Sequence, residues 1–365
     1  MLYNHMETPM SRKLLTLSLT ATLMGGTAFA DAPRVAVDIA PVHSLVARVM
    51  EGVGTPDLII QAGASPHEYS LRPSEAAALQ DANLVFWIGS GLTPWLTDTI
   101  ETLAPNANVT ELLEADGTIE LEFREGALFE AHDDHEEDEH DDEGDHKDDD
   151  DHADEAHDDH EEEGHDDHGD EKAGDYDHAD DDHDDEEAGH EGHDHGAHDP
   201  HAWLSTQNAM TWLNVIAGQL SAADPDNAGA YFANAAAGRA EIKVLIGEVT
   251  ATLDPVRDGR FIVFHDAYQY FETDFNFPAS GAISISDASD PSPARIAEIQ
   301  DRIAEQGIDC VLAEPQFNPG LIATVLEGSN AQTGILDPLG SDLKPGSALY
   351  PQLIRNLSTA LAGCM

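Results

Sequence analysis

Residues 224–255 read DPDNAGAYFANAAAGRAEIKVLIGEVTATLDP. The stretch is rich in alanine and has no proline or turn cluster between its two Asp-Pro pairs. Asp-Pro is typical of a helix start, and the second pair of this kind marks the stop. The pattern predicts a helix over 225–253 of about 29 residues, roughly 43 Å long at 1.5 Å per residue.

Short apolar runs alternate with helical patterns on both sides of this helix. Several runs are continuous rather than alternating, which is typical of strands buried on both faces of a parallel sheet. The runs cover 35–39, 57–61, 84–88, 261–264, 282–285, 310–313 and 334–336, and the predicted helices include 73–82, 206–220 and 293–306. The fold class is therefore α/β, with two parallel-sheet lobes joined by a long rigid helix. The alternative is one domain carrying a long surface helix.

The charge is concentrated in one segment. The chain has 365 residues with 73 acids and 16 bases, a net charge of -57. Residues 131–199 hold 37 acids, two lysines and 15 of the 20 histidines, so their charge is -35, and the remaining 36 acids and 14 bases give -22. A tract with so few apolar residues predicts a disordered loop inserted in the first lobe. The acidity excludes a nucleic-acid binder and favours cations as partners.

The first 30 residues have the pattern of a signal peptide. A basic Arg12-Lys13 pair precedes the apolar run 14–24, and Ala28-Phe29-Ala30 is a cleavage site. The run is too short for a usual membrane span, so we expect an exported, periplasmic protein. The predicted organisation is a signal peptide and N-terminal extension (1–30), a first lobe (31–223) containing the loop 131–199, a linker helix (224–254) and a second lobe (255–365).

Two cysteines, Cys310 and Cys364, are the whole cysteine content. In an exported protein such a pair favours a disulfide, which would tie the end of the chain to the strand near 310. Neither residue has the spacing of a zinc motif.

Three histidines lie beside predicted strands or helices. His67 follows the strand at 57–61, His265 follows the strand at 261–264, and His201 precedes the helix at 206. Glu314 and Asp337 follow strands in the same way, and ligands of open α/β sheets bind at the carboxyl ends of strands. Three His and one Asp are a tetrahedral zinc set. The alternative is that each histidine is a hydrogen-bonded structural residue, and a capping or core role is expected for His43.

Five segments resemble the zinc-uptake solute-binding proteins of bacterial ABC importers, the ZnuA type: GASPHEYSLRPS (63–74), DPHAWLS (199–205), FIVFHDAYQYFE (261–272), CVLAEPQFNP (310–319) and GILDPLG (334–340). The resemblance covers nearly all of the mature chain and includes the acidic insertion. It implies two lobes around an interlobe cleft, zinc ligands at His67, His201 and His265, and a family disulfide between Cys310 and Cys364.

The resemblance leaves the fourth zinc ligand open. Some members use a Glu directly before the first His, and this position is Pro66 here. We expect Asp337, then water, then Glu68. Glu314 is expected to accept a hydrogen bond from a ligand His. Manganese-type relatives replace the third His by a carboxylate, so His265 points to zinc.

The acidic tract contains closely spaced histidine pairs, which favour a low-affinity metal collector over a solubilising spacer. The auxiliary candidates are His132, His135, His157, His160, His165, His168, His190, His193, His195 and His198.

The sequence thus predicts a monomeric periplasmic protein that binds Zn²⁺ with high affinity and delivers it to an ABC transporter permease. It is not expected to be an enzyme. The alternatives are a secreted zinc hydrolase, a zinc buffer or chaperone without a transporter, and a manganese receptor. A hydrolase would use Glu68 or Glu314 as a base, but the chain has no H-E-x-x-H motif.

Overall fold

The computed structural model describes Met1 and residues 32–124, 129, 198–284, 291–317 and 319–365. The predicted signal peptide, apart from Met1, lies outside the described residues. So do nine of the ten tract candidates, from His132 to His195.

The first lobe contains a parallel sheet with strand order β2-β1-β3-β4. Its two central strands are fully buried, which explains their continuous apolar sequences. The strands are β1 (Val35–Val37), β2 (Asp57–Leu58), β3 (Leu84–Trp87) and β4 (Asn108–Glu111). Strand β4 was not predicted from the sequence, because it is an edge strand with polar residues.

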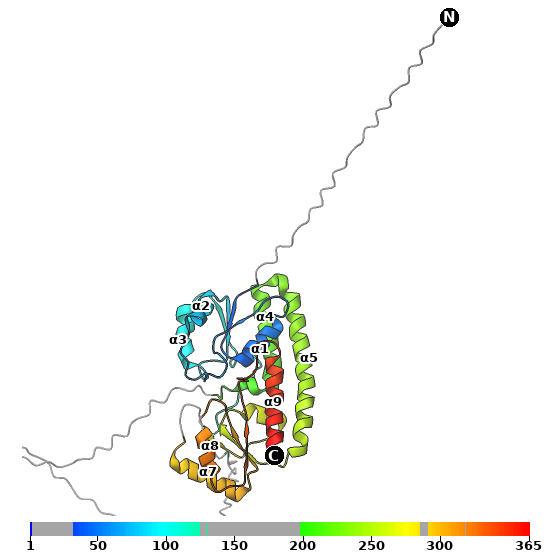
Figure 1. Ribbon diagram of the computed structural model, residues 1–365. Coiled ribbons are helices and arrows are strands. Elements are labelled where there is room, and N and C mark those ends of the chain that lie inside the picture. The colour runs from blue at the N-terminus through cyan, green and yellow to red at the C-terminus, as the bar shows by residue number, and fades with distance from the viewer. Residues whose placement is uncertain (2–31, 125–128, 130–197, 285–290, 318) are drawn as a thin grey trace, which may run out of the picture.

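Helices cover both faces of this sheet, with α2 and α3 on one side and α1 and α4 on the other (Figure 1). Two of them have clear start signals. At α2 the Glu75 carboxylate accepts a hydrogen bond from Arg72 N at 2.8 Å, and at α4 Ser205 Oγ accepts from the backbone N–H of Gln207 and Asn208. The helices are α1 (Ala40–Val49), α2 (Pro73–Asp81), α3 (Pro94–Leu103) and α4 (Thr206–Ala223).

The second lobe repeats this plan, with a parallel sheet in the order β6-β5-β7-β8. Its strands are β5 (Phe261–His265), β6 (Ala282–Ser284), β7 (Cys310–Ala313) and β8 (Gln332–Ile335), and its helices are α6 (Gln269–Phe275), α7 (Pro293–Gln306) and α8 (Pro319–Val325). In Figure 1, α7 and α8 lie on one side of this sheet. The predicted fold class of two parallel-sheet α/β lobes is confirmed.

The predicted long helix is α5 (Ala228–Leu253), which runs along both lobes (Figure 1). Residues Pro225–Asn227 form a separate 3₁₀ turn, so the helix is 26 residues long rather than about 29. It packs closely on α4, because a Cβ atom at Gly238 would lie only 3.0 Å from Leu213 Cδ1.

The C-terminal helix α9 (Leu349–Cys364) makes a second connection, which the sequence analysis did not predict. It packs against α1, α5 and β8, and therefore contacts both lobes. Near its start, Tyr350 N donates to Ser44 Oγ of α1 at 2.9 Å. At its end, Cys364 forms the predicted disulfide with Cys310 of β7. The helix α9 thus joins the two lobes in addition to α5.

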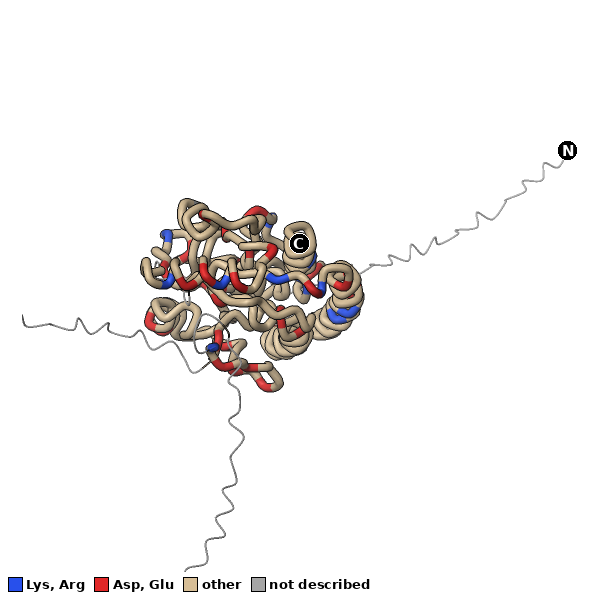
Figure 2. The backbone as a smooth tube through the Cα atoms, turned by 90° about the horizontal axis from the view of Figure 1, so that it is seen from below, with Lys and Arg blue, Asp and Glu red and all other residues tan. Residues whose placement is uncertain are grey.

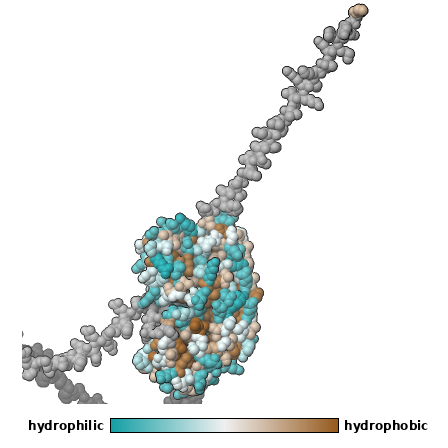
Figure 3. Space-filling model, in the orientation of Figure 1, coloured by the Kyte–Doolittle hydropathy of each residue, from teal (hydrophilic) through white to brown (hydrophobic). Residues whose placement is uncertain are grey.

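The described surface is mixed in character. Figure 2 shows Asp and Glu distributed over the described backbone with few Lys and Arg, and Figure 3 shows apolar residues broken up by hydrophilic ones on the visible face. Among the described residues, no helix has the length and apolarity needed to cross a membrane.

Candidate metal centre

The three predicted ligand histidines lie close together where the two lobes meet. The ring centroids of His201 and His265 are 5.2 Å apart, and those of His67 and His201 are 6.0 Å apart. His201 and His265 are buried, with 7% and 3% exposure, whereas His67 is half-buried. Residues separated by 64 and 134 positions in the chain thus form one cluster.

Each histidine is positioned by a different element. His265 is the last residue of β5, so it projects from the carboxyl end of the second sheet. His67 lies in the loop after β2, which is held by Trp95 of α3, whose Nε1 donates to Pro66 O at 2.8 Å. His201 precedes the 3₁₀ turn Ala202–Leu204, where Trp203 Nε1 donates to Pro338 O at 2.8 Å.

Two buried carboxylates set the orientation of two imidazoles. His265 Nδ1 lies 2.6 Å from Glu314 Oε1, and His201 Nδ1 lies 2.7 Å from Asp199 Oδ1. The same Asp199 oxygen also accepts the backbone N–H of His201. Because carboxylate oxygens accept hydrogen bonds, we assign the ring proton to Nδ1 in both histidines. The Nε2 atoms then carry lone pairs.

These two Nε2 atoms face each other at a distance of 3.4 Å. A zinc ion binds imidazole nitrogen at about 2.0–2.1 Å, and the edge of a tetrahedron with such bonds is about 3.3–3.4 Å. The separation of the two nitrogens is therefore the one that two ligands of a tetrahedral zinc ion adopt. The carboxylates behind them fix the tautomer and raise the basicity of the ligands.

Asp199 was missed as a functional residue, because it was counted as the last acid of the tract. Burial raises its pKa to about 7, although the His201 backbone N–H and the charges of Arg124, His265 and His67 act in the opposite direction. Its position two residues before His201 could have identified it in the sequence. From this position one carboxylate can contact both the backbone and the ring of that histidine.

The remaining candidates lie in different settings. Asp337 Oδ1 accepts from the backbone of Leu339 and Gly340, and its Oδ2 accepts from the backbone and hydroxyl of Ser341. Glu68 is exposed. His198, the one tract candidate in the described residues, pairs with Glu120 at 3.1 Å on the surface.

His43 lies on α1, as a buried residue whose Nε2 contacts Pro56 O at 3.1 Å. Burial lowers its pKa, so the ring is neutral at pH 7. This setting agrees with the core role expected for it.

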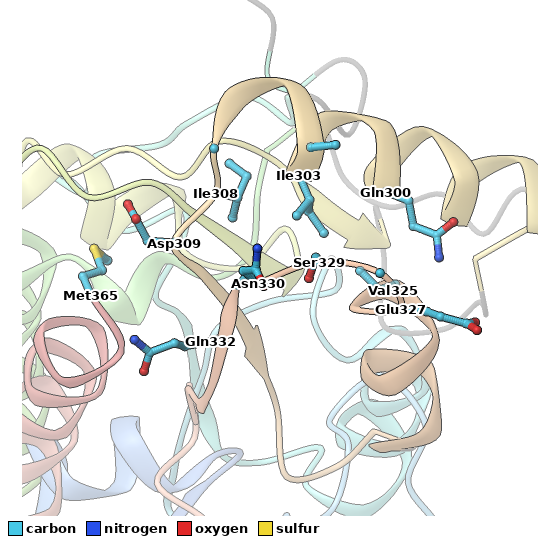
Figure 4. A pocket seen from close by; sticks show the side chains of 14 residues that line it. Gln300, Ile303, Ile308, Asp309, Val325, Glu327, Ser329, Asn330, Gln332 and Met365 are labelled. Atoms are coloured by element: carbon cyan, nitrogen blue, oxygen red, sulfur yellow. The ribbon is translucent and has the colours of Figure 1, made fainter.

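Within the described residues, no group of three His, Cys, Asp or Glu side chains has the full geometry of a metal site. The geometric result is therefore the facing pair of His201 and His265, with His67 beside it. A pocket of 640 Å³ lies elsewhere, near the amino ends of β7 and β8, and Figure 4 shows its labelled lining, which contains no histidine.

Two parallel-sheet lobes bridged by long helices, with a polar cluster between the carboxyl ends of their strands, define a two-lobed solute-binding protein. Comparison with known proteins agrees. The ZnuA family, described as "Zinc-uptake complex component A periplasmic", matches residues 35–364. This chain belongs to that family, which confirms the resemblance seen in the sequence.

The similarity extends over whole chains. The high-affinity zinc uptake system protein ZnuA of Brucella abortus is 45% identical over 351 residues, which are 96% of this chain and 97% of the relative. The corresponding protein of Paracoccus denitrificans is 43% identical over 92% of this chain and 93% of its own. A crystal structure of a ZnuA matches with a TM-score of 0.64 at 21% identity, covering 92% and 99% of the two chains, and so supports the fold.

Family membership also settles the functional class. ZnuA-type proteins are transport binding proteins and not enzymes, so the hydrolase considered above is excluded.

Proposed function

We propose that this chain is the periplasmic receptor of a zinc importer, which captures Zn²⁺ between its lobes through His67, His201 and His265. The observation that carries the proposal is the 3.4 Å separation of the His201 and His265 Nε2 atoms, each aimed by a buried carboxylate. Neutral imidazole is a preferred zinc ligand. The zinc uptake named for its relatives supports the choice of metal.

His67 supplies the third nitrogen in this proposal. Its ring is farther from His201 than the His265 ring is, and it lies on a half-buried loop. We expect zinc to draw His67 toward the other two histidines. A water molecule is now the favoured fourth ligand, because both oxygens of Asp337 already accept two hydrogen bonds each from their own turn. Asp337 and Glu68 stay as alternatives.

Zinc titration of single His→Ala variants at positions 67, 201 and 265 tests the proposal. We expect each to weaken zinc binding by more than the ~10–100-fold that loss of an outer hydrogen-bond partner costs. His43→Gln is the matched control, because His43 is a buried histidine placed elsewhere, on α1. Wild-type affinity in the His201→Ala and His265→Ala variants would refute the site. Competition with Mn²⁺ tests the manganese alternative.

Delivery to an ABC transporter permease in the inner membrane is the second part of the proposal, and it rests on the uptake systems named for the relatives. A zinc buffer or chaperone would bind the metal equally well. The two are separated by zinc uptake in cells grown under chelation. Deleting this chain slows uptake if it serves a permease and leaves uptake unchanged if it is a buffer. We expect the receptor to act as a monomer, which light scattering measures.

We further propose that the acidic tract collects zinc weakly, through its spaced His pairs and carboxylates. Deletion of 131–197 should lower the zinc stoichiometry in calorimetry and leave the tight site intact. An unchanged stoichiometry would show that the tract is only a spacer.

A further inference from the structure

The two chain segments that flank the insertion pair with each other in the described structure. We call residues 119–124 and 198–199 the insertion base. Asp199 N donates to Leu121 O at 2.8 Å, and Glu122 forms an antiparallel bridge with His198. The two segments of the insertion base are thus held together by backbone hydrogen bonds.

The insertion base is attached to the second lobe. Tyr270 of α6 accepts from Leu121 N at 3.0 Å and donates its hydroxyl hydrogen to Asp199 O at 2.8 Å, so one hydroxyl holds both segments. Asn208 of α4 joins the same segment to the first lobe, because its side chain bonds with the backbone N and O of Ile119.

Arg124 makes the charged contact between the insertion base and the second lobe. Its guanidinium donates to the carboxylate of Asp266 and to the carboxylate of Glu272, and Nη1 lies 2.7 Å from Glu272 Oε2. The side chains of all three are largely buried, with exposures of 16%, 9% and 5%. Glu272 is itself fixed by Ala279 N at 3.0 Å. A planar fork held by two anchored carboxylates leaves little freedom for the backbone that carries it.

These contacts adjoin both facing histidines. Asp266 directly follows His265 in the chain, and Asp199 holds the His201 ring through its carboxylate. Arg124 therefore ties the segment that orients His201 to the residue after His265. It is the only Lys or Arg between Arg72 and Lys147, so it stands out in the sequence as well.

We propose that Arg124 is a positioning residue of the zinc site, which clamps the insertion base to the second lobe and so fixes the separation of the His201 and His265 Nε2 atoms. The proposal rests on the proposed zinc-binding function and adds a charged side-chain connection between the lobes to those made by α5 and α9. The role belongs to the guanidinium geometry and not to the positive charge alone.

A purely electrostatic role predicts the opposite result. A positive charge near a bound cation repels it, so removing the charge would tighten zinc binding. Loss of a clamp instead lets the two nitrogens separate and weakens binding. The sign of the change in affinity therefore distinguishes the two roles.

The experiment compares zinc Kd values of Arg124→Gln and Arg124→Lys by competition with a chelating dye, at a temperature where circular dichroism shows each variant folded. Lysine keeps the charge and loses the fork. We expect both variants to bind zinc ~10-fold more weakly, as for other residues that orient metal ligands. Arg48→Gln is the matched control, because Arg48 makes a similar fork to Glu241 on the α1–α5 face. We expect it to bind like wild type.

Unchanged or tighter zinc binding by Arg124→Gln overturns the proposal. If Arg124→Gln fails to fold, Arg124→Lys and Tyr270→Phe replace it, since Tyr270→Phe removes a different contact of the same insertion base. Wild-type affinity in both then overturns the proposal. Failure of the proposed function is recognised separately, because in that case the wild-type chain binds no zinc.

Discussion

At the scale of single residues, the candidate metal centre depends on which ring nitrogen carries the proton. Glu314 and Asp199 accept from the Nδ1 atoms of His265 and His201 and leave the two Nε2 atoms to face each other. A carboxylate behind a ligand histidine fixes its orientation and strengthens it as a donor to the metal. Removing the charge of Glu314 while keeping its hydrogen bond therefore tests how much the carboxylate strengthens His265 as a ligand.

Glu314→Gln should weaken zinc binding by ~10–100-fold. The amide can still accept a hydrogen bond from His265 Nδ1, but it lacks the charge that makes the imidazole a stronger ligand. Isothermal competition against a chelator measures the change. Glu241→Gln on the exposed face of α5 is the control, and an equal loss in both variants would mean that the effect is not specific to His265.

A second residue-scale feature is the buried Asp38 at the end of β1, which accepts from the backbone N–H of Ile39 and Ile88 at 2.7 Å each. Burial raises its pKa from 3.8 to about 7, although these hydrogen bonds act in the opposite direction. As the pH rises from about 4 to about 7, the unfolded chain loses this proton before the folded protein does. This carboxyl group therefore makes the free energy of unfolding fall over that range.

Asp38→Asn should remove this pH-dependent fall in the free energy of unfolding, which is on the order of 4 kcal/mol. The asparagine keeps one acceptor oxygen, so the variant also loses one backbone hydrogen bond at every pH. Urea unfolding between pH 4 and pH 7.5 in the presence of a chelator measures both effects. The exposed Asp98→Asn should keep the wild-type slope, and the same slope in Asp38→Asn would contradict the assignment.

At the scale of elements, two helices hold the lobes together. The helix α5 runs beside both lobes. The helix α9 is bonded near its start by Tyr350 N, which donates to Ser44 Oγ, and at its end by the disulfide between Cys364 and Cys310. A residue separation of 54 closes a large loop in the unfolded chain. The cross-link therefore restricts the unfolded state more than the folded one.

The double variant Cys310→Ser/Cys364→Ser should lower the free energy of unfolding by roughly 2–4 kcal/mol. Zinc affinity under folded conditions should be close to wild type, because the bridge joins the last residue of α9 to the first residue of β7, whereas His265 is the last residue of β5. Chemical denaturation with and without a reductant tests this. The reductant should destabilise the wild type and leave the double variant unchanged, whereas equal effects on both would refute the role of the bridge.

At the scale of the whole molecule, zinc should act as a bridge between the lobes, since His67 comes from the first and His265 from the second. A ligand that binds only the folded protein stabilises it by mass action, by about 2.7 kcal/mol at 100 times its Kd. The expected result is a rise of several degrees in the melting temperature on adding zinc, reversed by a chelator.

This rise should shrink as the pH falls through about 6.5, because protons compete with zinc for the imidazole nitrogens. Scanning calorimetry at several pH values, with and without zinc, measures it. In His265→Ala the rise should be nearly absent. A full zinc-induced rise in that variant would place the stabilising metal elsewhere.

The sequence by itself determined the features that are encoded locally. Continuous apolar runs predicted the two parallel sheets, and the stretch 224–255 predicted the long helix. The positions of His67, His201 and His265 beside predicted strands and helices marked them as candidate ligands. Edge strand β4 and helix α9 were missed, because β4 is polar and α9 owes its position to packing against both lobes.

Only the tertiary structure decided how the site is built. Ring orientation depends on partners such as Glu314, which is 49 residues from His265, and Arg124 meets Asp266 across 142 residues. Contacts over such separations leave no periodic signal in the chain, since they exist only once the two lobes have packed together.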